Sequence, residues 1–497
     1  MNDLVSPAQS AFIKKRSIHD NFTYVCNLTR RLHRSKTPML LFKLDIKKAF
    51  DSLRWDYLMD LLQHIGFPAR FRDWVSALLT SATSRVLLNG TVGDPIRHGK
   101  GLRQGDPMSP LLFVLAIDPL HHILSKATTQ GKLLPIRRNT ATLRASLYAD
   151  DAAVFVKPAK EDVSCFASIL ALPRQTHEFP MTYLGLPLSV KRLKAVHFLP
   201  LEDKVACRLA PWVGHLMAAP RRVVLVKAVL TAIAIYSITL LILTAEVMKR
   251  IDALRRAFLW AVCDKATGGK RKINWNKVCS PKAMGGLGVL SLDKFDTALR
   301  LRWLWNEWAE QPKPWVGLGT PCTEDDRDLF AAATRVVVGN GDKACFWTSP
   351  WLDGLRPMDI APKIFEISKK KDCSVRKALI DDLWISQVDM ANGITVGHIQ
   401  EFTILWEKLD GITLDQDTND TIIWKLTESG SYSTSSAYSL QFEGRTSTPL
   451  LKTVRKVWAT PKCKFFACNG RPRPGLEDRP ARSSSAARLH RHRQRRA

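Results

Sequence analysis

The chain has 497 residues, of which 45% are hydrophobic, so it is long enough for several domains with sizeable cores. Lys and Arg number 74 against 46 Asp and Glu, and the net charge of +28 favours a polyanionic partner such as nucleic acid. The ten cysteines are scattered and the first 25 residues hold no apolar segment. This argues against a secreted, disulfide-bonded protein and predicts an intracellular one.

The first elements alternate between strand and helix patterns. Residues 39–45 predict a strand that ends in an acid, Asp45. Apolar residues at helical spacing follow over 58–65 and over 71–79. Residues 85–92 then predict a hairpin with an Asn-Gly turn.

A helix and an acidic hairpin come next. Ser109 is expected as the helix N-cap and Pro110 as its first residue, with an apolar face that continues to Leu120. In the hairpin, Asp150 and Asp151 form the tip between two apolar, β-prone segments. This order of elements predicts an α+β fold with helices on one face of the sheet.

The rest of the chain is mostly helical up to about residue 310. The uncharged run 228–245 reaches the length of a membrane span, but its Thr, Ser and Tyr residues and closely flanking charges favour a buried helix. Trp-rich stretches such as 346–354 predict buried aromatic cores. Residues 471–497 are rich in Arg, Pro, Ser and Ala and predict a disordered basic tail.

The acids suggest a metal site. If the strand of Asp45 neighbours the hairpin of Asp150 and Asp151, three carboxylates converge, and with the backbone carbonyl of Ile46 they suit Mg²⁺. Two such ions would activate a primer 3′-hydroxyl and stabilise a leaving pyrophosphate. A single acid at a strand end is more often a turn or cap residue, but three in this placement favour nucleotidyl transfer.

The loop 101–110 lies between the two acidic segments. Its glycines allow a nucleotide to approach the backbone, and the helix N-terminus that follows favours phosphate. Gln104 is a candidate for hydrogen bonding to a base, and Arg103 for contact with phosphate. A purely structural loop leading into a capped helix explains the same string equally well.

Taken together, these segments resemble the reverse transcriptase region of plant non-LTR retrotransposons of the LINE type. The similarity extends over about residues 7–468. It is carried by Ser10–Asn21, Lys43–Ser52, Gly101–Pro110, Tyr148–Asp151, Tyr183–Leu188, Gly285–Gly288 and Trp458–Phe466.

The resemblance implies a right-hand polymerase with a palm, partial fingers and a helical thumb. Asp45 and Asp150 would be the main metal ligands with Asp151 beside them, binding two Mg²⁺ ions or Mn²⁺ in their place. The implied partners are an RNA template, a DNA primer and deoxynucleoside triphosphates. No membrane and no particular protein partner is inferred.

The resemblance also implies roles at the nucleotide. Phe50 would exclude a 2′-hydroxyl, although an ordinary core phenylalanine fits the same position. Gln104 and Gly105, with Arg103 beside them, would place the templating base or incoming nucleotide. Arg16 would contact the triphosphate.

We expect the following organisation: partial fingers at 1–38, palm at 39–190, helical thumb or connection at 191–310, a retroelement C-terminal region at 311–440, the start of a zinc-binding module at 441–470 and the Arg-rich tail at 471–497. From the comparison with the family, we expect that no endonuclease domain precedes residue 1, that most of the fingers are missing, and that a palm segment is lost near 172–174. The Cys and His ligands of the zinc module are missing, so no zinc is expected.

These losses leave two main hypotheses. One is an RNA-directed DNA polymerase with impaired activity, and the other is an inactive nucleic-acid-binding remnant of such an element. A maturase-like splicing factor ranks last, because no maturase domain follows the palm motifs. A nuclear location is favoured over a cytoplasmic one by the element family and the basic tail.

Overall fold

The computed structural model describes residues 1, 3–46, 48–136, 143–170, 178–208, 217–260, 273–308, 313–380, 383–389 and 393–443. The described residues form two compact units: one lies within residues 1–207, 231–252 and 292–443, and the other within 208–230 and 253–291. The predicted palm loss near 172–174, nearly all of the predicted zinc module and the basic tail lie outside the described residues.

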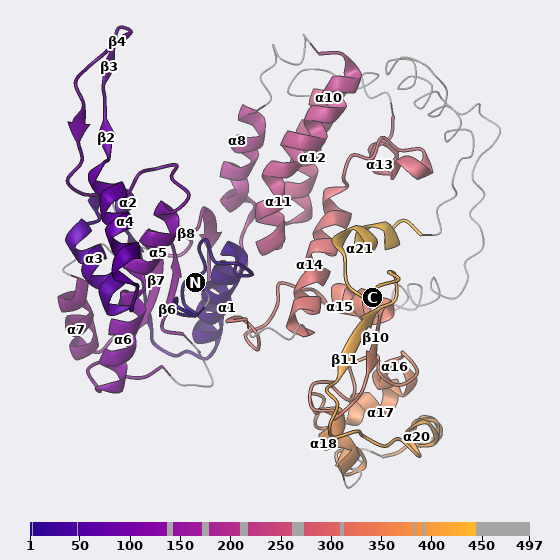
Figure 1. Ribbon diagram of the computed structural model, residues 1–497. Helices are drawn as coiled ribbons and strands as arrows, with labels where there is room; N and C mark the ends of the chain where they lie inside the picture. The colour runs from indigo at the N-terminus through magenta and orange to yellow at the C-terminus, as the bar shows by residue number, and fades with distance from the viewer. Residues whose placement is uncertain are drawn as a thin grey trace. The chain divides into compact units, whose positions relative to one another are not determined.

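The first 190 residues alternate between helices and short strands (Figure 1). In chain order they are α1 (Ile18–Arg34), β1 (Leu40–Asp45), α2 (Ala49–Ser52), α3 (Trp55–His64), α4 (Ala69–Thr80), β2 (Thr83–Ser84), β3 (Leu87–Leu88), β4 (Thr91–Val92), β5 (Ile96–Arg97), α5 (Ser109–Ile117), α6 (Pro119–Thr129), β6 (Ala145–Tyr148), β7 (Asp151–Val156), α7 (Lys160–Leu170), β8 (Met181–Tyr183) and β9 (Leu186–Leu188). The predicted strand, helices and Asn-Gly hairpin are confirmed.

Two details of the predicted helix at 109 are wrong. Its N-cap is Met108 rather than Ser109, and the Met108 N–H donates to the Asp106 carboxylate at 2.9 Å. The helix also does not run on to Leu120, because it ends at Ile117 and α6 begins at Pro119. Proline has no N–H to continue the hydrogen-bond ladder and favours the first turn of a new helix.

The central sheet has three antiparallel strands in the order β1-β7-β6. One face is apolar and packs against α6 and α7, with helices covering it as predicted. The buried residues of this core are Ala8, Leu44, Leu124, Ala127, Leu133, Ala145, Leu147, Ala152, Val154, Val156 and Phe166, and Phe42 packs against them. Since side chains alternate along a strand, Lys43, Asp45 and Asp151 lie on the opposite face.

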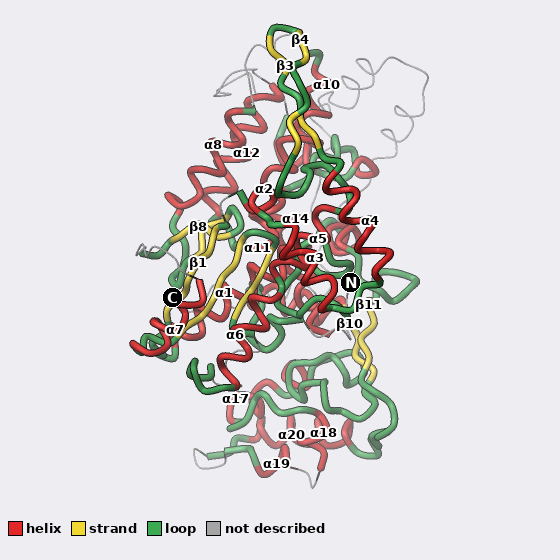
Figure 2. The backbone as a smooth tube through the Cα atoms, turned by 60° about the vertical axis from the view of Figure 1, so that its left-hand side comes forward, coloured by secondary structure: helices red, strands yellow, loops and turns green. Residues whose placement is uncertain are grey.

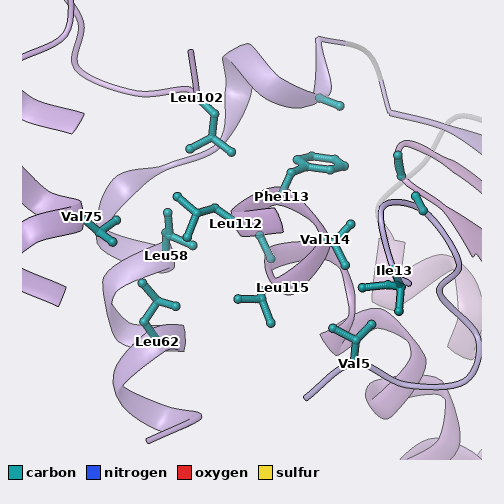
Figure 3. Close-up of a cluster of buried hydrophobic side chains, with 14 of the residues drawn as sticks. Val5, Ile13, Leu58, Leu62, Val75, Leu102, Leu112, Phe113, Val114 and Leu115 are labelled. Atoms are coloured by element: carbon teal, nitrogen blue, oxygen red, sulfur yellow. The ribbon is translucent and has the colours of Figure 1, made fainter. Parts of the chain in front are cut away.

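A second core joins the helices that follow β1 to the N-terminal segment (Figure 3). Val5 and Ile13 lie beside Val114 and Leu115 of α5. The other labelled residues are Leu58, Leu62, Val75 and Leu102, from α3, α4 and the glycine loop, and Leu112 and Phe113 of α5. Residues that precede the sheet therefore contribute to the packing around it.

The later elements are mainly helical, as predicted for 191–310. They are η1 (Ala195–Phe198), α8 (Leu199–Cys207), α10 (Ala219–Leu225), η2 (Val226–Leu230), α11 (Thr231–Leu240), α12 (Ala245–Trp260), α13 (Trp275–Cys279), η4 (Lys282–Met284), α14 (Leu292–Trp308), α15 (Glu324–Ala333), β10 (Thr334–Val337), α16 (Pro357–Ile360), α17 (Pro362–Ile367), α18 (Val375–Leu379), α19 (Leu383–Ser386), α20 (Val396–Leu409), β11 (Thr421–Trp424) and α21 (Thr434–Leu440).

Two apolar features of the sequence have structural counterparts. The prediction of buried aromatic cores is confirmed at Phe346 and Trp347, which are 0% and 1% exposed. By length and composition, Ser109–Thr129, which comprises α5 and α6, and Ala219–Leu240 could each cross a membrane, and 44% of an 18-residue window in each is buried within the structure. The uncharged run from residue 228 is helical up to Leu240, and Ala234 and Ile238 are buried in it.

Candidate active site

The sheet places two of the predicted acids face to face. Asp45 at the end of β1 is the direct cross-strand partner of Asp151 at the start of β7. Residues that lie opposite each other in an antiparallel pair point to the same face, with Cβ atoms about 5 Å apart. The Ile46 N–H donates to the Asp150 carbonyl at 3.4 Å, so contact between the two segments continues to the third acid.

Asp150 belongs to the two-residue loop that joins β6 to β7. Its neighbour Ala149 has a φ of 52°, in the left-handed region that short hairpin loops require. The Ala149 N–H donates to the side-chain oxygen of Gln9 at 3.3 Å. The same oxygen accepts from the N–H groups of Ser10 and Ala11, both at 3.0 Å. A buried side chain from the N-terminal segment thus supports the acidic turn.

The main chain of that segment also runs along β6. The Leu147 N–H donates to the Ala8 carbonyl at 2.8 Å, and the Ser10 N–H donates to the Leu147 carbonyl at 3.1 Å. Asn21 of α1 donates to the Ser146 hydroxyl and to the Leu147 carbonyl, at 2.9 and 2.8 Å. These contacts satisfy the free edge of β6, which would otherwise leave buried backbone groups without partners.

Arg16 lies within this supporting segment. Its guanidinium donates to the carbonyls of Ser6 and Gln9 at 2.5 and 2.6 Å and to that of Val5 at 3.3 Å. Burial lowers the pKa of Arg16. In the structure, the Arg16 side chain stabilises the segment that carries Gln9. The predicted contact of Arg16 with a triphosphate stays a prediction.

The acidic face carries a net negative charge. The pKa of Asp151 is raised, chiefly by burial and further by the carboxylates of Asp150 and Asp45, while the Lys43 ammonium at 3.9 Å opposes the rise. A face with more carboxylates than cations suits a hard, oxygen-binding ion. Within the described residues, however, no three acidic, His or Cys side chains already surround a common point.

The glycine loop is fixed to the helix that follows Asp45. The Gly101 N–H donates to the Leu53 carbonyl and the Leu102 N–H to the Phe50 carbonyl, each at 2.7 Å. Gly101 has a φ of +85°, and a Cβ there would lie 2.8 Å from the carbonyl oxygen of Asp51. Only glycine permits this approach, so the loop begins beside the first acidic segment.

The predicted nucleotide-contacting residues of this loop are exposed. Gln104 donates to the Asp51 carboxylate at 3.4 Å, and Arg103 donates to the Ser81 hydroxyl at 3.4 Å. Gly105 has a φ of +96° with no atom near its Cβ position. Their roles at a base or phosphate stay predictions.

Phe50 lies on α2 and is half-buried. Its ring stacks on that of Phe113, with centroids 4.7 Å apart and an interplanar angle of 21°. The stack belongs to the second core, so the alternative of a core phenylalanine is satisfied here. Its role as a sugar-selecting residue stays a prediction.

The residues that form this acidic site lie in a segment that matches a known protein family. Residues 1–188 match the family described as reverse transcriptase (RNA-dependent DNA polymerase). Residues 1–188 are a reverse transcriptase domain. The prediction of a reverse transcriptase, which was made from the motifs, is confirmed for these residues. The predicted α+β fold class is confirmed as well.

Two relatives each match more than half of the chain. A protein of Arabidopsis thaliana named as a ribonuclease H protein is 26% identical over 315 residues, 57% of this chain and 47% of its own. The Pol polyprotein of retrotransposable element R2DM from Drosophila melanogaster is 26% identical over 345 residues, 60% of this chain and 31% of its own. The chain thus spans less than half the length of either protein.

Among solved structures, telomerase from Candida albicans in complex with a telomeric RNA fragment aligns with 59% of this chain and 52% of its own. The two chains are 12% identical over that alignment, and the TM-score is 0.29.

We call Asp45, Asp150 and Asp151 with the strand ends that carry them the acidic edge. Sequence reasoning missed the two buried amides that support this acidic edge of the reverse transcriptase domain. Gln9 is 0% exposed and Asn21 is 4% exposed. Nothing in the local pattern marks either as buried, because polar residues are mostly exposed and their partners lie far along the chain. The only signal was their place in or beside the segment Ser10–Asn21 that resembles the family.

Proposed function

We propose that the chain is an RNA-directed DNA polymerase that adds deoxynucleotides to a DNA primer on an RNA template. The observation that carries the proposal is the pairing of Asp45 with Asp151, with Asp150 in the adjoining turn, inside a reverse transcriptase domain. The whole chain's net charge of +28 suits a nucleic-acid substrate.

In this proposal Asp45, Asp150 and Asp151 hold divalent ions, Mg²⁺ or Mn²⁺, with the carbonyl of Ile46 as a further ligand. When bound, such ions supply the Lewis acidity that activates a 3′-hydroxyl and offsets charge on the leaving pyrophosphate. The excess of carboxylates over cations on this face supports a site for them. Lys43 limits the repulsion between the acids before substrate arrives.

The glycine loop and α2 position the nucleotide in the same proposal. Gln104 and Arg103 are exposed at the loop, while Gly101 fixes its start to α2. Phe50 on α2 would meet the sugar, and the stack on Phe113 would hold its ring in one orientation. Arg16 would act on the triphosphate only if its guanidinium left the carbonyls it binds.

We further propose an origin in a plant LINE-type element, with residues 191–310 as its thumb. The ordered motifs and the relatives from Arabidopsis and from the R2DM element support this origin. The second candidate function is an inactive nucleic-acid-binding remnant. One observation favours it: no three metal-binding side chains meet at one point within the described residues.

Primer extension separates the two candidates. Purified chain is incubated with an RNA template, a DNA primer, deoxynucleotides and Mg²⁺, beside the variant Asp150→Ala/Asp151→Ala and the control Asp60→Ala, which changes an exposed acid on α3. Extension by the wild type and the control alone supports the polymerase. Wild-type extension no greater than that of the double variant, with salt-dependent binding retained, supports the remnant.

A further inference from the structure

A long hairpin extends from the helical part of the reverse transcriptase domain. We call residues 83–98 the arm; it contains β2 to β5 and is seen at the upper left of Figure 1 and the top of Figure 2. At its base, Thr83 pairs with Arg97, and the His98 N–H donates to the Ala82 carbonyl at 3.1 Å. Further out, the Gly93 N–H donates to the Val86 carbonyl at 2.9 Å. The arm is therefore a hydrogen-bonded ribbon along its length.

The outer half of the arm is apolar and uncovered. Every residue from Thr83 to Lys100 is exposed. The exposed fractions of its large apolar side chains are 60% for Val86, 66% for Leu87, 71% for Leu88 and 56% for Val92, and Ile96 nearer the base is also 56% exposed. Such a concentration of exposed apolar side chains on an ordered element marks an interaction site.

The apolar side chains lie on both faces of the ribbon. Leu87 pairs with Val92 on one face, and Leu88 pairs with Thr91 on the other. A ribbon that docks flat on a protein surface needs one apolar face and keeps the other polar. A tip that is apolar on both faces fits insertion between two surfaces.

The base of the arm is cationic. Arg85, Arg97 and Lys100 lie on or next to it, and Asp94 is the only acid between Thr83 and Lys100. Within the described part of the chain, none of these three cations forms an ion pair. Unpaired cations beside an apolar tip match the phosphates and bases of a nucleic acid.

The arm is also tied to the acidic edge through the chain. After β5 the chain leads to Gly101. The Gly101 N–H donates to the carbonyl of Leu53, in the segment that follows Asp45 in the sequence. We propose that the arm binds nucleic acid at a junction between paired and unpaired strands, with its cations on phosphates and with Leu87 and Leu88 against the last base pair. This rests on the proposed function for nucleic acid as the substrate, and it adds a site outside the acidic edge.

Binding without catalysis tests the inference. The probe is an RNA–DNA duplex with a single-stranded fork and 2-aminopurine at the junction; a blunt duplex of equal length is the comparison. The full chain is compared with Leu87→Ser/Leu88→Ser, and the matched control Val396→Ser/Ile399→Ser removes similarly exposed side chains, 71% and 58% exposed, on α20. We expect wild type and control to raise the junction fluorescence and the tip variant to leave it unchanged.

A second variant tests the cations. Arg85→Gln/Arg97→Gln should weaken binding of both probes and lower the slope of log affinity against log salt by about two, one for each lost phosphate contact. A junction signal that survives in the tip variant, or a wild type that binds neither probe, overturns the inference. So does a tip variant that changes only the oligomeric state, which would assign the arm to a protein partner. None of these measurements depends on primer extension. A failure of the proposed polymerase activity can therefore be distinguished from a failure of this inference.

Discussion

The acidic edge and the arm are both hairpin structures of the reverse transcriptase domain, yet they are supported in opposite ways. The Ala149-Asp150 turn is held by Gln9, and β6 is held along its free side by the segment at 8–10. The Asn89-Gly90 turn of the arm is held by the pairing of β3 with β4, and every residue from Thr83 to Lys100 is exposed. One hairpin is positioned by distant parts of the chain and the other by local turn chemistry.

This difference indicates what each hairpin needs to do. Carboxylates that must stay within fractions of an ångström of a reacting group require neighbours that fix their backbone. An arm that meets a large, variable substrate needs only a firm base and a free tip. Substitutions in the two regions should therefore affect different measurements.

The largest effect is expected at the acidic edge itself. Asp45→Asn keeps the shape of the side chain and removes the charge opposite Asp151, so primer extension should fall by about 10²–10³-fold. Asp60→Asn, at an exposed acid on α3, is the control and should extend normally. Equal rates for Asp45→Asn and the wild type would remove Asp45 from the site.

The second-largest effect is expected for Gln9→Leu, because this change removes the side chain that supports the turn carrying Asp150. It removes the acceptor of three backbone N–H groups, which are those of Ser10, Ala11 and Ala149, and buried donors without a partner cost about 1–3 kcal/mol. We expect a loss of that size in urea unfolding. We also expect kcat for primer extension to fall more than KM rises, because the turn carries Asp150.

Gln130→Leu is the matched control for this variant, since Gln130 is exposed at the end of α6. Its unfolding midpoint and its extension rate should both stay near those of the wild type. A Gln9→Leu protein that is less stable but keeps its kcat would show that Gln9 serves folding alone.

Gly101→Ala tests the contact between the glycine loop and α2. A Cβ at Gly101 would lie 2.8 Å from the Asp51 carbonyl oxygen, at a φ of +85° that alanine rarely adopts. The free energy of unfolding should fall by about 1–3 kcal/mol, measured by chemical denaturation. Gly99→Ala has nothing within 4 Å of the new Cβ and should be near neutral, so equal losses would contradict the close approach.

The sequence predicted the arm better than it predicted the support of the acidic edge. Asn89-Gly90 between two β-prone segments is a local signal, and β3 and β4 flank it as expected. The convergence of Asp45 with Asp150 and Asp151 was predicted on the condition that their two strands are neighbours in one sheet, and the pairing of Asp45 with Asp151 meets that condition. Any one of these acids alone would have been interpreted as a turn residue, and it was the placement of all three that indicated a metal site.

The hydrogen bonds that support the acidic edge could not be predicted from local sequence patterns. Gln9 and Ala149 are 140 positions apart, and whether a glutamine is buried depends on the packing of the intervening chain. The N-cap of α5 failed for a related reason. Ser109 has the preferred residue type, but the carboxylate of Asp106 bonds the Met108 N–H and the cap falls one residue earlier.

The smallest effect is expected at the arm, and it completes the comparison. Leu88→Ala removes a side chain that is 71% exposed, so the free energy of unfolding should change by less than about 0.5 kcal/mol. The same exchange at Leu58, which is 0% exposed in the second core, should cost about 2–5 kcal/mol. Urea unfolding of the two variants measures both. A Leu88→Ala loss close to that of Leu58→Ala would mean that the arm folds back onto the domain, and its tip would then be unable to meet a substrate.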